Sequence, residues 1–139
     1  LRECLIKYKI KYIGIGSGSL ITCLSICTSN NMAILQPPSL KSLSILPFQI
    51  NCNYIHMDVR TSKIKAFVKE NENIPVLCLP KGTWIEVENG FITLKGAKKV
   101  AAILHINGKI QKCRPKDDLS YLFDSQTFSD DASWDFVHI

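Results

Sequence analysis

Two Asn-Gly dipeptides constrain the fold of this 139-residue chain more than any other feature. Two-residue β-hairpin turns of type I′ favour Asn-Gly because both central positions need a positive φ. Each pair stands between two strand-like runs: 84–87 and 91–94 flank Asn89-Gly90, and 100–106 and 109–112 flank Asn107-Gly108. The sequence therefore predicts two β-hairpins in its second half.

A second pattern near the N-terminus combines a strand, a glycine turn and a helix. Residues 11–15 (Lys-Tyr-Ile-Gly-Ile) predict a short strand, Gly16-Ser17-Gly18 predicts a sharp turn, and the apolar run 19–25 predicts a helix. This is the layout of a nucleophile elbow, in which the turn pushes one side chain out at the carboxyl edge of a sheet. The pattern marks a candidate catalytic turn.

The rest of the chain alternates helical and strand signals. Residues 1–9 predict the end of a helix, and 60–71 predict an amphipathic helix with apolar residues on one face and lysines on the other. Residues 43–50 form an apolar run that carries one proline, and the apolar run 75–79 predicts a buried strand. Together these elements indicate an α/β fold with a mixed, short sheet.

Composition indicates one soluble domain. Apolar residues make up 46% of the chain and charged residues 21%, which is typical of globular proteins. A membrane span needs about 18 or more mostly apolar residues in a row, and the uncharged run 12–40 is interrupted throughout by polar residues, glycine and proline. We therefore expect no membrane partner and a cytoplasmic location.

Charge is distributed unevenly along the chain. All seventeen Lys and Arg residues, with six acids, lie at or before Lys116, and six Asp with no basic residue follow it. A basic body can indicate nucleic-acid binding, but these lysines are scattered, without interleaved aromatic residues or a known binding motif. We expect no nucleic-acid partner, and we predict that residues 124–139 form an acidic, mobile tail.

The six cysteines do not form a metal-binding pattern. Cys23 and Cys27 are four residues apart, and no second pair at zinc-ligand spacing accompanies them. Reduced structural thiols are the favoured interpretation, with a metal site and a reactive thiol as the alternatives. The glycines at 14, 16 and 18 lack the spacing of a dinucleotide-binding loop. We predict no metal and no cofactor.

Five segments follow one another in a recognisable order: Tyr-Ile-Gly-Ile-Gly-Ser-Gly at 12–18, Thr-Ser-Asn-Asn-Met-Ala-Ile at 28–34, Gln-Pro-Pro-Ser-Leu at 36–40, Leu-Pro-Phe-Gln-Ile-Asn at 46–51, and Leu-Pro-Lys-Gly-Thr-Trp-Ile-Glu-Val at 79–87. Together they resemble peptidase E, the dipeptidase E or α-aspartyl dipeptidase family of serine peptidases. The resemblance implies part of a class-I glutamine-amidotransferase-like (flavodoxin-like) sheet. Residues 1–123 would be the C-terminal half of that domain, with its N-terminal strands missing.

The resemblance also identifies the positions of the family's catalytic triad. The Gly-x-Ser-x-Gly window falls on 14–18 and places Gly16 at the serine, while Ile-Asn-Pro-His falls on 50–53 and places Asn53 at the histidine. The glutamate after Leu-Pro falls on Lys81. Glycine has no nucleophile, the asparagine amide cannot accept the proton, and a cation opposes the imidazolium that a triad acid stabilises.

Surrogate residues lie close to these positions in the sequence. Ser17 follows Gly16, Cys52 precedes Asn53, and His56 lies three residues beyond it. A residual hydrolase using Ser17 or Cys52 with His56 is therefore one alternative. Residues 57–60 resemble, at Arg60 alone, the family's Gly-Glu-Thr-Arg stretch, which binds the substrate's aspartyl carboxylate. A substrate-binding role for Arg60 is one interpretation, and a surface residue at the start of a helix is the favoured one.

The favoured hypothesis is a truncated peptidase E-like protein without catalytic activity. The family hydrolyses dipeptides with an N-terminal Asp, so an aspartyl dipeptide is the expected ligand if the chain has one. A non-enzymatic binding or interaction module is the other alternative.

Missing strands would leave part of the sheet unpaired. An exposed strand edge with an apolar face favours association. We therefore expect the chain to self-associate, with Ile13, Ile15, Val76 and Leu77 at or near the exposed seam.

Overall fold

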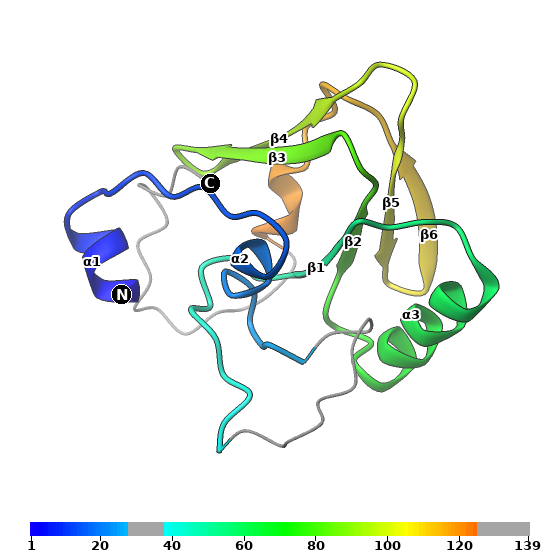
Figure 1. Cartoon of the computed structure of the whole chain (residues 1–139), viewed down its shortest axis with the longest axis horizontal. Helices are drawn as coiled ribbons and strands as arrows, with labels where there is room; N and C mark the ends of the chain where they lie inside the picture. The colour runs from blue at the N-terminus through cyan, green and yellow to red at the C-terminus, as the bar shows by residue number, and fades with distance from the viewer. Residues whose placement is uncertain (28–37, 125–139) are drawn as a thin grey trace.

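A four-stranded mixed sheet organises the computed structural model, which describes residues 1–27 and 38–124 (Figure 1). The elements are α1 (Arg2–Lys7), α2 (Ser17–Leu20), β1 (Gln49–Cys52), α3 (Asp58–Glu70), β2 (Val76–Leu79), β3 (Thr83–Glu88), β4 (Phe91–Gly96), β5 (Ala102–Ile106), β6 (Lys109–Cys113) and the 3₁₀ helix η1 (Ser120–Leu122). The expected tail beyond Asp124 and the family-like stretch 28–34 lie outside the described residues.

The sheet has the strand order β1-β2-β5-β6. β1 and β2 are parallel and are connected through α3, whereas β2, β5 and β6 pair antiparallel. Parallel neighbours need a crossover connection, usually a helix, and this explains the position of α3 between them in the chain. The predicted α/β fold with a mixed sheet is confirmed.

Both predicted hairpins are present. Asn89 and Gly90 connect β3 to β4 with φ values of 50° and 77°, and Asn107 and Gly108 connect β5 to β6 with φ values of 49° and 71°. Positive φ at both central residues is the conformation for which Asn-Gly is favoured. The β3–β4 hairpin forms a separate two-stranded sheet, while β5 and β6 join the main one.

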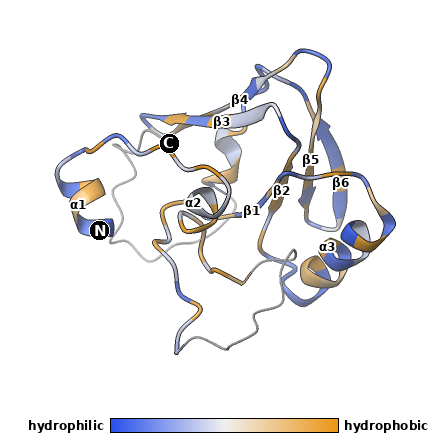
Figure 2. Cartoon of the chain, viewed as in Figure 1, coloured by the Kyte–Doolittle hydropathy of each residue, from blue (hydrophilic) through white to orange (hydrophobic). Residues whose placement is uncertain are grey.

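The two faces of the main sheet are covered differently. On one face, Ile64 of α3 packs against Val76 and Cys78 of β2. The other face packs against the β3–β4 hairpin and η1, in a larger cluster that includes Leu77 and Leu104. β2 lies between both layers, and all four of its residues are buried. β6 at the far edge is hydrophilic (Figure 2).

The predicted strand at 11–15 is wrong. This segment is not part of a sheet within the described residues; side chains hold it instead. The Tyr12 hydroxyl donates to the Gly18 carbonyl at 2.7 Å, and the Ser19 hydroxyl donates to the Gly14 carbonyl at 2.7 Å. A β-strand needs backbone hydrogen bonds to a neighbouring strand. The described residues place no strand beside this segment, so it stays an extended loop.

The predicted helix at 19–25 is also mostly wrong, because α2 ends at Leu20. The carbonyls of Ile21 and Thr22 accept hydrogen bonds from the backbone N–H groups of Leu43 and Ile45, at 2.9 and 2.8 Å. Those carbonyls would otherwise serve the next helical turn. Contacts with a distant segment therefore replace the helix.

The expected seam is partly wrong. Val76 and Leu77 are 1% and 0% exposed, because α3 and the β3–β4 hairpin cover the two faces of β2, while β1 and β5 pair with its two edges. Ile13 and Ile15 are each 85% exposed. β1 is an edge strand, and its Ile50 N–H donates to the Cys23 thiol at 3.3 Å. This N–H is therefore already paired and is not open to a strand of another chain.

No helix in the described ranges is long and apolar enough to cross a membrane.

Candidate functional site

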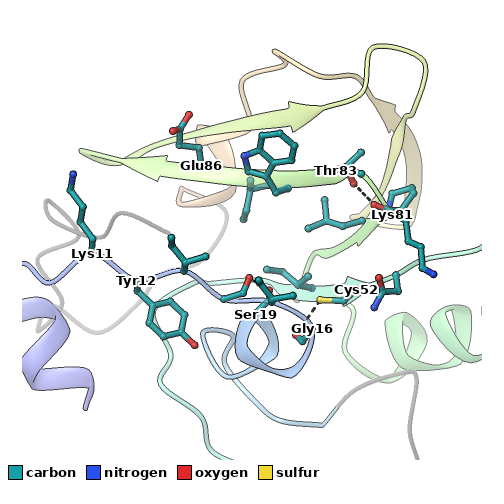
Figure 3. A pocket seen from close by; sticks show the side chains of 18 of the residues that line it. Lys11, Tyr12, Gly16, Ser19, Cys52, Lys81, Thr83 and Glu86 are labelled. Carbon is teal, nitrogen blue, oxygen red and sulfur yellow. Dashed lines mark hydrogen bonds between the residues drawn. The ribbon is translucent and has the colours of Figure 1, made fainter.

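A cleft of about 750 Å³ lies at the carboxyl ends of β1 and β2 (Figure 3). The extended segment 11–16 forms one wall and β3 forms another, with Ser19 of α2 at the floor. Three positions that the sequence singles out line this cleft: Gly16, Asn53 and Lys81. Cys52 lines it as well.

Parallel pairing explains why Asn53 and Lys81 share this cleft. Cys52 at the end of β1 is in register with Leu79 at the end of β2. Parallel strands present their carboxyl ends at one edge of the sheet, which is where ligands bind in open α/β sheets. Asn53 follows β1 with a φ of 52°, and Lys81 follows β2 after Pro80.

Gly16 forms the predicted sharp turn before α2. Its φ of 58° and ψ of −117° are values that residues with a side chain rarely adopt. A Cβ on Gly16 would meet no atom within 4 Å, whereas a Cβ on Gly14 would lie 2.8 Å from the backbone of Gly18. The turn therefore keeps an open space where an elbow side chain would project, and Gly14 closes the turn by tight backbone packing.

Cys52 contacts this turn directly. Its thiol donates to the Gly16 carbonyl at 3.5 Å (Figure 3). Burial raises the pKa of the Cys52 thiol, and a hydrogen bond with Ser19 offsets only part of that rise. A raised pKa leaves little thiolate at neutral pH, and the thiolate is the nucleophilic form.

The other sequence-predicted residues lie outside the cleft lining within the described chain. Ser17 is exposed at the start of α2. His56 is exposed, with its Nδ1 3.2 Å from the Tyr54 hydroxyl. Arg60 Nη1 donates to the Asn53 carbonyl at 2.6 Å. Arg60 thus positions the backbone at the cleft margin, and the structure does not bring His56 into the cleft beside Cys52.

Charged side chains of both signs border the cleft. Lys11 and Lys81 lie at opposite ends of it (Figure 3). Glu86 and Glu88 of β3 line the cleft as well, and Glu86 forms an ion pair with Lys95 of β4 at 3.0 Å. That pairing balances the charge of Glu86 locally. Lys11, Lys81 and Glu88 then leave the cleft lining with an excess of one positive charge, which favours an acidic group.

Sequence reasoning missed Ser19 and Trp84. Ser19 lies three residues after Gly16 on α2, and helical spacing of three places it on the same side as the turn. This three-residue spacing is the signal in the sequence that could have identified Ser19 as a cleft residue. Trp84 is 56% exposed on β3 and lines the cleft; its place depends on how the hairpin packs, and no local pattern shows this.

The cysteines are unpaired in the described chain, and most are chemically quiet. Burial raises the pKa of Cys23 and of Cys78 to about 12. Burial also raises the pKa of Cys113, which is near Asp117. Among the residues described, no group of three or more His, Cys, Asp and Glu side chains is placed to hold a metal ion.

Comparison with known proteins identifies the family of the chain. The sequence profile described as Peptidase family S51 matches residues 1–95. The chain belongs to this family. A Peptidase E of Nostoc sp. is 33% identical over 125 residues, covering 85% of this chain and 51% of the relative. A Peptidase E of Streptomyces coelicolor is 33% identical over 135 residues, covering 89% and 55%.

A third relative carries a more specific name. The "Probable alpha-aspartyl dipeptidase" of Drosophila melanogaster is 28% identical over 130 residues, covering 88% of this chain and 53% of the relative. The chain therefore spans about half the length of these curated relatives. The resemblance to peptidase E is confirmed.

We predict that Cys52 reacts slowly with iodoacetamide at pH 7.5, after Cys4, which is exposed. The raised pKa of Cys52 keeps it as a thiol, so its alkylation accelerates as the pH rises toward 10. Peptide mass spectrometry over a time course measures both rates. Labelling of Cys52 ahead of Cys4 at pH 7.5 would show an activated thiol.

Proposed function

We propose that this chain is a non-hydrolysing member of peptidase family S51 whose cleft binds an acidic dipeptide. One observation carries the proposal: the three positions that the resemblance matches to the triad lie around one cleft and hold Gly16, Asn53 and Lys81. The cleft is retained while the reactive groups are replaced.

The chemistry of each replacement supports the absence of hydrolysis. Gly16 leaves the side-chain space of the turn empty, so there is no hydroxyl to attack. The amide of Asn53 is not a base. Triad members act as a unit, and loss of one alone lowers turnover by up to about 10⁶-fold. Three replacements together leave no route for acyl transfer through these positions.

The ligand proposal rests on the relatives and on the lysines of the cleft. One relative is named a probable alpha-aspartyl dipeptidase, so a dipeptide with N-terminal Asp is the probe of choice. Lys81 is exposed at the cleft and suited to a carboxylate. We assign the carboxylate to Lys81 rather than to Arg60, because Arg60 already donates to the Asn53 carbonyl.

A residual hydrolase using Ser17 or Cys52 with His56 has less support. Ser17 is exposed outside the cleft lining, and His56 contacts Tyr54. The raised pKa of Cys52 works against nucleophilic attack. Stoichiometric labelling of Ser17 by a fluorophosphonate, together with turnover of Asp-Leu, would overturn the non-hydrolysing proposal.

We also propose a flavodoxin-like fold class and a cytoplasmic location for this chain. The β1–α3–β2 crossover supports a flavodoxin-like sheet of the class-I glutamine-amidotransferase type. We propose that residues 1–123 belong to this domain. Six cysteines without a disulfide support a reducing, cytoplasmic location.

We predict that Gly16→Ser does not create dipeptidase activity. The new side chain has space, but Asn53 supplies no base for its hydroxyl. The positive φ at Gly16 also strains any side chain, and we expect a stability loss of about 1–3 kcal/mol. Release of free aspartate from Asp-Leu measures activity, and a thermal melt verifies folding. Cleavage by a folded Gly16→Ser variant would refute the prediction.

We predict that Lys81→Gln weakens binding of Asp-Leu about fivefold, as expected for loss of one exposed ion pair of about 1 kcal/mol. Isothermal titration calorimetry gives the dissociation constant. Lys99→Gln is the control, because Lys99 is exposed and does not line the cleft. Equal affinity of wild type and Lys81→Gln would remove Lys81 from the ligand site.

We further propose that the chain self-associates through the exposed side chains of Ile13 and Ile15. Exposed apolar side chains on an extended segment favour association. We predict that Ile13→Ser/Ile15→Ser lowers the oligomer fraction in sedimentation velocity at micromolar concentration. Val59→Ser is the control, since Val59 is 66% exposed on α3. A monomeric wild type would contradict the proposal.

A further inference from the structure

A second cleft, of about 540 Å³, lies between α3 and the β5–β6 hairpin. Lys65, Lys69 and Glu72 line it from the α3 side, His105 from β5 and Lys109 from β6. None of these residues belongs to the cleft at the carboxyl ends of β1 and β2. The second cleft is therefore separate from the proposed dipeptide site and plays no part in the proposed dipeptide binding.

The lysines of this cleft are arranged unfavourably for a protein without a ligand. Lys65 and Lys69 are four residues apart on α3, and like charges at this spacing destabilise a helix by a few tenths of a kcal/mol. Lys109 adds a third cation from the start of β6. Within the described residues, none of the three forms an ion pair. Glu72 offsets one charge, so the cleft keeps an excess of two positive charges.

His105 lies on the same side of the sheet as α3. Ile103, two residues earlier on β5, packs against the α3 cluster, and alternation along a strand places His105 on that face. His105 is 6% exposed. Burial lowers its pKa, and the nearby Lys65 lowers it further. The imidazole is therefore neutral at pH 7 and carries one N–H donor.

We propose that this second cleft binds the phosphoryl group of a small phosphate monoester. Its excess charge matches a phosphate monoester, which carries nearly two negative charges at neutral pH. Lys65, Lys69 and Lys109 supply the cationic donors, as lysine commonly does for phosphate. The cleft volume lies within the range of small-molecule sites.

A small ligand fits the cleft better than a nucleic acid does. Single-stranded nucleic acids bind through aromatic stacking as well as charge, and the lining residues in the described ranges include no aromatic side chain other than His105. A duplex needs many phosphate contacts along a surface. Three lysines around one bounded cleft instead suit one phosphoryl group.

The test follows the His105 ring by NMR while ribose 5-phosphate is added to the full chain at constant ionic strength. We expect a saturable shift of its ring resonances and a rise in the pKa of His105, because a bound dianion favours the imidazolium. Ribose, which lacks the phosphoryl group, is expected to leave both unchanged. Absence of a saturable shift with ribose 5-phosphate would overturn the proposal.

Matched variants on one helix locate the binding. Lys65→Gln and Lys69→Gln are each expected to raise the dissociation constant about fivefold. Lys63→Gln is expected to leave it unchanged, because Lys63 is exposed on α3 but does not line the cleft. Equal weakening by Lys63→Gln would indicate diffuse charge attraction and overturn the site. So would a short DNA duplex that binds more tightly than ribose 5-phosphate and loses affinity in the Lys65 and Lys69 variants.

Discussion

Parallel pairing of β1 with β2 is the constraint on which the rest of the structure depends. It requires a crossover, and the chain supplies α3, whose Ile64 covers one face of the sheet. It also brings the chain after each strand to one edge, so Asn53 and Lys81 border the same cleft. The same helix forms one side of the second cleft. One pairing thus determines where both clefts lie.

The elbow turn separates backbone geometry from chemistry. Its shape depends on the close approach of Gly14 to Gly18 and on the positive φ of Gly16. Neither feature needs a reactive side chain, so the turn persists although Gly16 offers none. The Cys52 thiol lies beside the turn and donates a hydrogen bond to the Gly16 carbonyl. A turn of this kind can keep its form with or without a reactive side chain.

Local signals predicted the fold where local forces decide it. The Asn-Gly turns and the buried strand β2 are examples, since turn geometry and apolar runs act within a few residues. The helix expected over 19–25 failed because Leu43 and Ile45 bond to its carbonyls from a distant segment. Likewise, the family resemblance pointed to three positions that line one cleft, but spacing alone did not reveal that His56 contacts Tyr54.

The position of the Cys23 thiol affects how the protein responds to oxidation. It accepts a hydrogen bond from the Ile50 N–H on the edge strand β1. Unpaired N–H and C=O groups of an edge strand can otherwise pair with a strand of another chain. Oxidants attack thiolates that they can reach. Cys23 is 0% exposed and its pKa is raised to about 12, while Cys4 and Cys27 are exposed. Under oxidative stress the outer thiols are consumed first, and the sulfur that protects the sheet edge is spared.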